Sequence, residues 1–225
     1  MEDIVSLVIR TRNEIAWIGQ CLTAVKLQKI ENVEIVVVDN CSTDGTPELA
    51  SNCGCKVVEI PDEQFTYGRA LNLGIAASSG RAIGLLSGHC IPVNDMWLIR
   101  LRASLEADGI AGVYGRQEPL PDSNDFDKRD LWTTFPIERR IQRKDSFFHN
   151  ANSMIRRSVW EKFPFDEDLD GVEDRAWAKK VIAAGYAIAY EPQARVYHHH
   201  GIHQGRDEHR AERVVRVIEL IHRQG

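Results

Sequence analysis

Apolar and polar residues alternate in blocks along the first 92 residues, and each block predicts one element. Residues 4–9 form a nearly continuous apolar run, which is typical of a strand buried on both faces of a parallel sheet. Similar runs at 34–38, 56–60 and 83–86 predict three more strands. Apolar residues recur at helical spacing from Ile15 onward and over 68–77, between the strands. These strand–helix repeats predict right-handed β-α-β units in a doubly wound sheet.

Two of the predicted helices begin with residues that favour helix starts. Asn13 precedes the first helical pattern and is predicted to cap that helix. Thr46 is predicted as the N-cap of the second helix, with Pro47 at its first helical position.

After Pro92 the pattern is less regular. It predicts helices over 96–105 and 172–184, and strands over 110–114, 153–155 and 186–190. The polar, proline-interrupted stretch 119–143 predicts a long functional loop that faces a substrate. Residues 207–221 place their apolar side chains on one stripe, which predicts an amphipathic helix that packs on the domain, with membrane association or dimerisation as the alternatives.

Composition narrows the class of protein. A chain of 225 residues with 43% hydrophobic and 27% charged residues is expected to form one globular domain. A net charge of −5 gives no global attraction to nucleic acid or to anionic lipid. No apolar run approaches the roughly 18 residues of a membrane span, and no signal peptide pattern is present, so we expect a cytoplasmic protein. Five cysteines without paired C-x-x-C units predict free thiols.

Polar residues follow the first two predicted strands where ligands of open α/β sheets bind. No glycine-rich dinucleotide motif or P-loop follows the first strand, which excludes the common dehydrogenase and P-loop classes. Thr11, Arg12 and Glu14 come after the first strand, and Asp39 and Asn40 end the second. A carboxylate there can accept from a base or a ribose, and an arginine plane can stack on a base. The alternative, that Asp39 caps a turn and Arg12 is solvated, stays open.

His89 follows the apolar run 83–86 and is a candidate ligand for the same reason. The alternative is a histidine in a turn whose imidazole bonds a backbone carbonyl.

Three segments, 5–14, 34–46 and 68–74, resemble the family 2 glycosyltransferases, and the resemblance extends to about residue 201. It implies a single GT-A domain over 1–225, an α/β fold in which helices flank the Rossmann-like mixed sheet of nucleotide-diphospho-sugar transferases. In this division 1–92 is the nucleotide-sugar-binding half, 93–203 the acceptor-binding and catalytic half, and 204–225 a C-terminal amphipathic helix.

The resemblance also assigns a donor site. The residues implied to bind the nucleotide sugar are Thr11, Arg12, Glu14, Asp39, Asn40, Arg69, Asn72 and Ser87.

The metal motif departs from the family pattern. The family has Asp-x-Asp after the fourth strand, where this chain has Ser87-Gly88-His89, similar to the Asp-x-His variant of polypeptide N-acetylgalactosaminyltransferases that binds manganese. Imidazole suits Mn²⁺ better than Mg²⁺, so His89 predicts a divalent cation with Mn²⁺ preferred. His198, in a histidine-rich stretch, is implied to complete the metal or diphosphate site. A zinc site built from that stretch is a competing interpretation.

Glu173 and Asp174 match the Glu-Asp motif of the family. The resemblance implies that Asp174 is the base that deprotonates the acceptor and that its neighbour Glu173 binds the acceptor, although the sequence does not separate the two roles. One base without a covalent partner is what inversion at the anomeric carbon requires. The alternative is structural, since acidic residues in a first helical turn are favoured by the helix dipole.

The resulting hypothesis is an inverting glycosyltransferase of glycan or polysaccharide biosynthesis. It uses a UDP-sugar donor and a glycan or lipid-linked acceptor, makes peripheral contact with the inner face of the membrane at most, and binds no nucleic acid. The alternatives are a dTDP-deoxysugar (rhamnosyl-type) transferase, a nucleotide-sugar-binding protein without turnover, and a nucleotidyltransferase.

Overall fold

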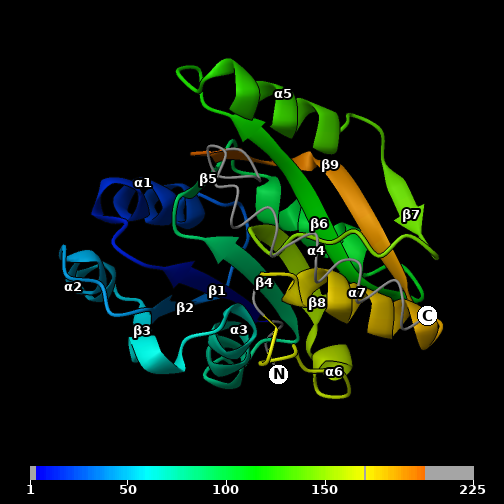
Figure 1. Ribbon diagram of the computed structural model, residues 1–225, viewed down its shortest axis with the longest axis horizontal. Helices are drawn as coiled ribbons and strands as arrows, with labels where there is room; N and C mark the ends of the chain where they lie inside the picture. The colour runs from blue at the N-terminus through cyan, green and yellow to red at the C-terminus, as the bar shows by residue number, and fades with distance from the viewer. Residues whose placement is uncertain (1–3, 170, 201–225) are drawn as a thin grey trace.

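One mixed β-sheet runs through the computed structural model, which describes residues 4–169 and 171–200 (Figure 1). Within these residues the sheet has nine strands, in the order β3-β2-β1-β4-β8-β6-β9-β5, with β7 paired to β9. The strands are β1 (Val5–Thr11), β2 (Val33–Asp39), β3 (Lys56–Glu59), β4 (Ala82–Ser87), β5 (Cys90–Pro92), β6 (Ile110–Pro119), β7 (Arg140–Gln142), β8 (Asn152–Arg156) and β9 (Ala187–His198). The predicted α/β class with a mixed sheet between helices is confirmed.

The first half of the sheet is parallel, as the strand–helix repeats predict. Strands β3, β2, β1 and β4 pair side by side in parallel. Helices α1 (Ile15–Lys26), α2 (Thr46–Asn52) and α3 (Tyr67–Ala76) lie between these strands in the chain. The carboxyl ends of β1 and β4 are therefore neighbours, with Arg10 opposite Ser87.

The second half adds antiparallel strands. Strand β8 pairs antiparallel with both β4 and β6, whereas β9 runs parallel to β6. The far end of β9 pairs antiparallel with the short β5, so that Cys90 lies opposite His198. This pairing brings residue 198 beside the turn that follows β4.

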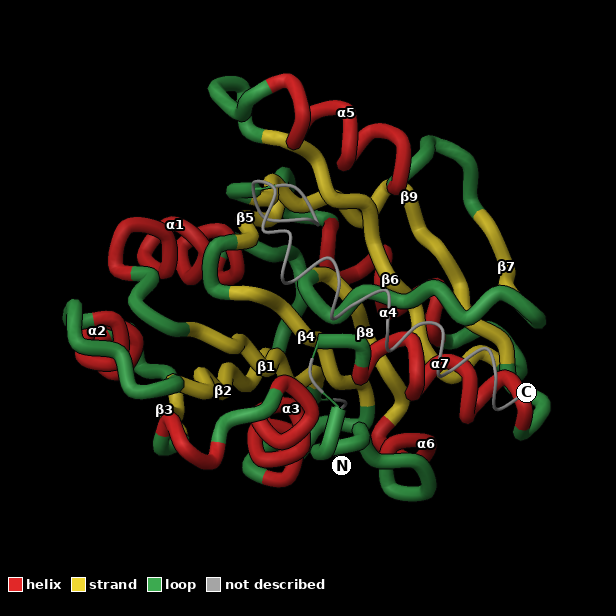
Figure 2. The backbone as a smooth tube through the Cα atoms, in the orientation of Figure 1, coloured by secondary structure: helices red, strands yellow, loops and turns green. Residues whose placement is uncertain are grey.

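Helices cover both faces of the sheet, as the red segments on either side of the yellow strands show (Figure 2). Side chains of β1 alternate between the faces. Val5, Leu7 and Ile9 belong to a buried cluster with α1, α2 and α4 (Trp97–Leu105). Val8 belongs to a second cluster with residues of α3, α5 (Asp125–Thr134), α6 (Arg157–Trp160) and α7 (Glu173–Ala183).

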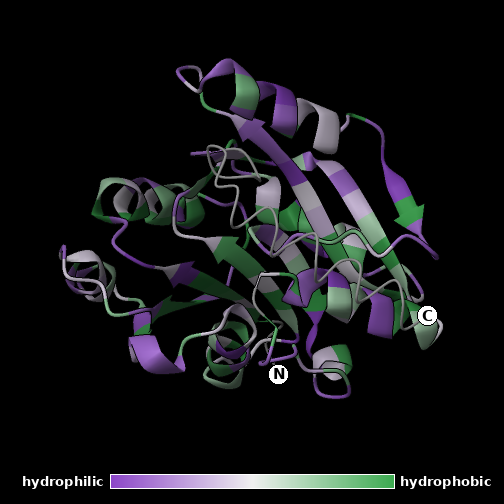
Figure 3. Cartoon of the chain, in the orientation of Figure 1, coloured by the Kyte–Doolittle hydropathy of each residue, from purple (hydrophilic) through white to green (hydrophobic). Residues whose placement is uncertain are grey.

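Hydropathy along the strands separates the core from the site. Strand β1 is apolar along its length and becomes polar at its arrowhead (Figure 3). Because the apolar part is buried against helices, the polar carboxyl end is left at the rim of the sheet.

Both predicted helix caps are wrong by one residue. Helix α1 begins at Ile15 with Glu14 as its N-cap residue. Asn13 lies in the left-handed region (φ 50°), and its Oδ1 accepts from the backbone N of Thr43. Gly45 (φ 93°) is the N-cap of α2, so Thr46 is the first helical residue; its hydroxyl accepts from the backbone N of Glu14.

The stretch 119–143 is not a simple loop, which corrects the prediction. It contains the ten-residue helix α5 and the strand β7, which pairs with β9. Strands β6 and β9 are also longer than predicted, at 10 and 12 residues. The amphipathic helix predicted over 204–225 lies outside the described residues. In the described part of the chain, no helix has the length and apolar character needed to span a membrane.

Candidate active site

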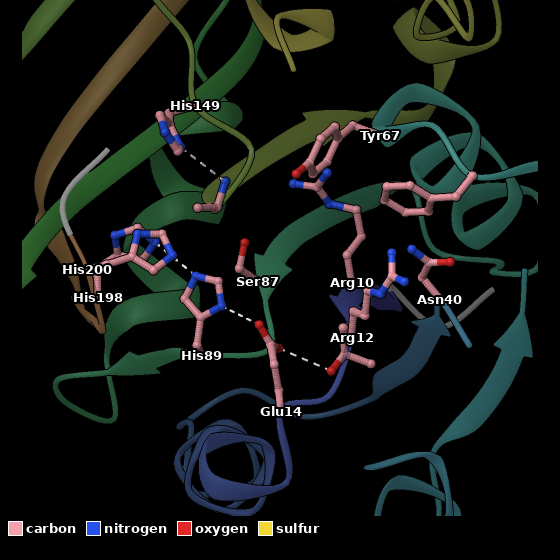
Figure 4. Close-up of a pocket in the computed structure, with 13 residues that line it drawn as sticks. Arg10, Arg12, Glu14, Asn40, Tyr67, Ser87, His89, His149, His198 and His200 are labelled. Carbon is pink, nitrogen blue, oxygen red and sulfur yellow. Dashed lines mark hydrogen bonds and ion pairs between the residues drawn. The ribbon is translucent and has the colours of Figure 1, made fainter. Parts of the chain in front are cut away.

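An open cleft of about 290 Å³ lies where the carboxyl ends of β1 and β4 meet the end of β9 (Figure 4). Histidines 89, 149, 198 and 200 line one side, Arg10, Tyr67 and Asn40 the other, and Ser87 lies between them. Of the predicted site residues, seven line this cleft: Thr11, Arg12, Glu14, Asn40, Ser87, His89 and His198. Asp39, Arg69, Asn72, Glu173 and Asp174 are not among its lining residues.

Glu14, His89 and His198 form a hydrogen-bonded chain on the histidine side. The Glu14 carboxylate contacts His89 Nδ1 through one oxygen and accepts from the Thr11 hydroxyl through the other, at 3.1 Å. The Nε2 atoms of His89 and His198 are 3.0 Å apart. Because Nδ1 of His89 contacts the carboxylate, the ring is oriented with its Nε2 toward His198. The predicted alternative, a histidine held by a backbone carbonyl, is therefore not the arrangement found.

His198 is buried at the end of β9, with 2% of its surface exposed. Burial, and then the neighbouring histidines 89, 200 and 149, hold the pKa of its imidazole well below the usual value. Its Nδ1 has no hydrogen-bond partner among the residues that the structure describes. His198 is therefore a neutral ring, which is the form that binds metal ions.

Gly88 allows the turn after β4 to approach Glu14 closely. A Cβ atom at residue 88 would lie 2.2 Å from Glu14 Oε2 and 3.1 Å from Thr11 Oγ1. A larger residue at 88 would therefore displace the Glu14 carboxylate from its present position.

Cys90 follows this turn and lies opposite His198 in the β5–β9 pair. The ligand atoms of His89, Cys90 and His198 all lie within 4.8 Å of one another. Burial raises the pKa of the Cys90 thiol well above its usual value. Imidazole and thiol are ligands that borderline and soft metal ions prefer.

Arg10 is a cleft residue that the sequence analysis does not select. It is the penultimate residue of β1, its guanidinium lies 5.0 Å from the centre of the Tyr67 ring, and its Nη1 is 3.8 Å from Glu173 Oε1. Neither Nε nor Nη1 has a hydrogen-bond partner within the described ranges, although both are buried. Buried donors of this kind require an explanation, and a bound anion would supply acceptors. Its position directly after the predicted strand 4–9 is the sequence signal for it.

At the end of β2, Asp39 is hydrogen-bonded within a turn, whereas the side chain of Asn40 has no partner among the described residues. Both Asp39 oxygens accept from Ser42, one from the backbone N at 2.9 Å and the other from the hydroxyl at 2.6 Å. Asp39 therefore caps a turn, the alternative that the sequence left open. Asn40 is 2% exposed, and neither Oδ1 nor Nδ2 has a partner in the described part of the chain.

Three other predicted donor residues have partners within the protein. Arg12 pairs with Asp62 at 2.7 Å at the edge of the cleft, and Arg69 donates to Gln64 at 3.2 Å. The Asn72 amide donates to Phe165 O and Glu167 Oε1 and accepts from Trp160 Nε1 and Phe165 N. Asn72 thus ties α3 to the segment before α7.

Glu173 and Asp174 are the first two residues of helix α7 and are not among the residues that line the cleft. Glu173 is 4% exposed, and its Oε1 lies 3.4 Å from Asn150 Nδ2 and near Arg10. Asp174 Oδ1 accepts from the backbone N of Arg175 at 2.7 Å. Burial, and then the charge of Glu173, raise the pKa of Asp174 above its ordinary range. A carboxylate with a raised pKa is a stronger base near neutral pH.

His149 is a second cleft residue that no sequence motif predicts. Its Nδ1 lies 3.1 Å from Gln117 Nε2 and accepts from the backbone N of Ala151 at 3.3 Å. It precedes β8, and no motif around it points to the site.

Comparison with known proteins gives a family match. The model described as "Glycosyl transferase family 2" matches residues 6–163. Glycosyltransferase AglE of Haloferax volcanii is 32% identical over 195 residues, which cover 83% of this chain and 64% of AglE. The O-antigen chain rhamnosyltransferase RfbN of Salmonella typhimurium is 29% identical over 208 residues, 87% of this chain and 66% of RfbN. This chain thus spans just under two thirds of the length of these relatives.

A solved structure shares the fold. The mannosyltransferase PcManGT from Pyrobaculum calidifontis, in complex with GDP-Man and Mn²⁺, superposes with a TM-score of 0.77 at 20% identity. The match covers 98% of this chain and 64% of PcManGT.

Proposed function

The chain belongs to glycosyl transferase family 2 and has the GT-A fold, and from this premise we propose that it transfers a sugar from a nucleotide sugar to an acceptor hydroxyl.

The observation that carries the proposal is the partly buried Arg10 guanidinium, which lines the cleft, has buried Nε and Nη1 atoms without hydrogen-bond partners among the described residues, and lies 3.8 Å from Glu173. A diphosphate accepts charge-assisted hydrogen bonds from such a group, and arginine is suited to phosphate oxygens. Arg10 would hold the leaving diphosphate beside the carboxylates that act on the acceptor.

Asn40 is proposed to bind the base. Its buried, unpartnered amide offers one acceptor and two donors. The imide edge of uracil presents the complementary donor and acceptor, and the Phe65 and Tyr67 rings line the same side of the cleft. We therefore propose a UDP-sugar as the donor, with Thr11, Arg12, Glu14 and Ser87 along its path. In this role Asn40 replaces Asp39, and Arg69 and Asn72 support the fold around the donor.

A divalent cation fits the histidine side of the cleft. The His89 and His198 Nε2 atoms converge to 3.0 Å, which suits two ligands of one ion or one shared proton. His89 is oriented by a carboxylate, as metal-bound histidines usually are. Nitrogen ligands favour Mn²⁺ over Mg²⁺, and the PcManGT complex contains Mn²⁺. When bound, the cation would offset negative charge on the diphosphate.

Asp174 is proposed as the base of an inverting reaction. Its carboxylate takes the acceptor hydroxyl proton while the acceptor oxygen bonds to the anomeric carbon. The bond from that carbon to the diphosphate oxygen breaks, and the nucleoside diphosphate leaves with the electron pair. Arg10 donates to the leaving oxygens, and Glu173 binds the acceptor next to Asp174.

We propose that the two halves of the sequence have different roles in binding. Residues 1–92 supply the base and diphosphate contacts, and 93–203 supply the acceptor side together with His149, His198 and His200 at the cleft. Because RfbN acts on an O-antigen chain, we propose a glycan or lipid-linked acceptor in polysaccharide biosynthesis. The five free cysteines accord with a cytoplasmic protein.

Release of UDP from UDP-sugars tests this function. We expect release that depends on Mn²⁺ and falls by about 10²–10⁴-fold in Asp174→Asn. Binding of UDP-sugars without release for every donor, acceptor extract and metal would contradict transfer and favour a binding protein.

A dTDP-deoxysugar donor is the second candidate, because RfbN is a rhamnosyltransferase. Thymine and uracil share the imide edge, so Asn40 does not distinguish them. The same assay with dTDP-rhamnose distinguishes the two donors. Release of dTDP from dTDP-rhamnose in preference to release of UDP from UDP-sugars would make a dTDP-sugar the donor in place of a UDP-sugar.

A further inference from the structure

Cys90 places a sulfur atom beside the two histidines of the proposed cation site. The ligand atoms of His89, Cys90 and His198 lie within 4.8 Å of one another, and all three residues are at least partly buried. Backbone pairing fixes two of them, since Cys90 and His198 are opposite each other in adjacent strands. His89 is fixed by Glu14.

The spacing is close to that of a tetrahedral zinc site. Zinc bonds of about 2.0–2.1 Å to nitrogen and about 2.3 Å to sulfur place two nitrogens roughly 3.3 Å apart, and nitrogen and sulfur roughly 3.6 Å apart. The two Nε2 atoms are 3.0 Å apart and need little movement. The ligand atoms lie within 4.8 Å of one another, so the sulfur needs to approach the nitrogens by about 1.2 Å at most.

Few oxygen ligands, which hard cations such as Mg²⁺ prefer, lie at this position. Glu14 is the carboxylate in contact with His89, and its two oxygens bond His89 and Thr11. Ser87 supplies no charge. Mg²⁺ requires oxygen ligands in near-octahedral geometry, whereas two imidazoles and a thiolate are a zinc set.

We propose that Cys90 is the third protein ligand of this cation site and that the site therefore binds Zn²⁺ more tightly than Mn²⁺. The proposal rests on the proposed function in one respect, the assignment of His89 and His198 as ligands. On binding, the Cys90 S–H bond breaks, its proton passes to solvent, and the sulfur bonds the ion. Three protein ligands leave the fourth zinc position for an oxygen of the donor diphosphate, as in catalytic zinc sites.

Cobalt titration of the reduced, metal-free protein tests this ligand set. Co²⁺ replaces Zn²⁺ in such sites and absorbs in the near ultraviolet when a thiolate binds it. We expect this thiolate band to appear on addition of Co²⁺, to vanish on addition of equimolar Zn²⁺, and to survive a large excess of Mn²⁺. Absence of the band, or its removal by Mn²⁺ at equal concentration, would overturn the proposal.

Two cysteine variants separate ligation from packing. Cys90→Ser is expected to lose the thiolate band and to bind Zn²⁺ at least about 10-fold more weakly, since even loss of a residue that orients a ligand costs that much. Cys21→Ser is the matched control, because Cys21 is equally buried in the same cluster. It should keep the band. A band that persists in Cys90→Ser contradicts the proposal.

X-ray absorption of the zinc-loaded wild-type protein requires no variant. One sulfur at about 2.3 Å with nitrogen or oxygen at about 2.0 Å is expected. A shell of nitrogen and oxygen alone would contradict the role of Cys90.

The two proposals fail in different ways. A thiolate band without transferase activity would support the zinc site and contradict the proposed function. Mn²⁺-dependent sugar transfer without the band would support the proposed function and contradict the role of Cys90 as a ligand.

Discussion

Arg10 is the residue whose loss should weaken donor binding most. Hydrogen bonds to charged groups contribute about 1.5–3 kcal/mol, so Arg10→Gln is expected to raise the Kd for UDP by roughly 10- to 100-fold. Isothermal titration calorimetry measures the Kd for UDP in the wild type and in the variant. Arg102→Gln is a surface control, since Arg102 pairs with Glu106 on α4. Equal affinity in both variants would remove Arg10 from the donor site.

Asp174→Asn should inactivate the protein without destabilising it. The folded protein holds the Asp174 proton more tightly than the unfolded chain, because burial and Glu173 raise this pKa. Stability is therefore lost as pH rises from the unfolded value near 4 through the folded value. A neutral amide avoids that cost and still accepts from Arg175, so a gain of about 1 kcal/mol, or ~2–4 °C in Tm, is expected at pH 8.

Wild-type activity should depend on pH for the same reason. Its acid limb is expected above the ordinary aspartate range near 4 and should be absent in Asp174→Asn. Asp168→Asn, which removes an exposed carboxylate, is the control. Wild-type turnover in Asp174→Asn would contradict the assignment of Asp174 as the base.

Glu14→Gln should weaken metal binding although Glu14 is not a ligand. Removing the carboxylate that orients a metal-bound histidine typically costs 10- to 100-fold in affinity, and that loss is expected for Co²⁺ titrated by absorbance. Glu106→Gln, at the exposed C-cap position of α4, should leave the affinity unchanged. Wild-type affinity in Glu14→Gln would show that His89 does not bind the ion through this arrangement.

Single residues were predictable from sequence where a motif ended a predicted strand. Thr11, Glu14, Asn40 and His89 all follow strands, and all line the cleft. Arg10 directly follows the predicted strand 4–9 but was missed because no motif residue marks it, and β1 in fact extends through it to Thr11. His149 was missed because its position depends on β8 pairing with β4. The partners of Asp39 and Asn72 could not be predicted from the sequence. Those of Asp39 depend on local turn geometry, and those of Asn72 belong to a segment 93 residues away.

Among the elements, the turn between β4 and β5 leaves little space for a side chain at residue 88. A methyl group at Gly88 would lie 2.2 Å from the Glu14 carboxylate, the end of a side chain that can rotate away. Gly88→Ala is therefore expected to break the Glu14–His89 contact and lower metal affinity about 10-fold or more, with a small change in Tm. Gly19→Ala is the control, since its Cβ would make an ordinary 3.5 Å contact with Leu49. Unchanged metal affinity in Gly88→Ala would contradict this account.

The parallel strands and their helices were predictable because each shows its own period of apolar residues. The elements that close the site were not. Strand β9 extends to His198 with polar residues interspersed, and its length is set by pairing with β5, β6 and β7. Helix α5 has one fully buried apolar residue, Leu131, so its sequence carries little helical signal.

At the scale of the whole molecule, the cleft exists because the sheet joins two halves of the chain. The parallel half contributes Arg10, Asn40 and His89, and the antiparallel half contributes His149 and His198. The helix-rich faces bury the apolar side chains on both sides, so the polar strand ends are left to bind a ligand. A ligand that bridges the halves should therefore stabilise the entire fold.

Thermal unfolding with nucleoside diphosphates tests the central claim, that this cleft is a nucleotide-sugar site, most directly. UDP with Mn²⁺, at about 100 times its Kd, should stabilise the wild-type protein by about 2.7 kcal/mol, or ~5–10 °C, and should shift Asn40→Ala and Arg10→Gln far less. No shift with UDP, dTDP or GDP under any metal, or an equal shift in the wild type and both variants, would contradict the account.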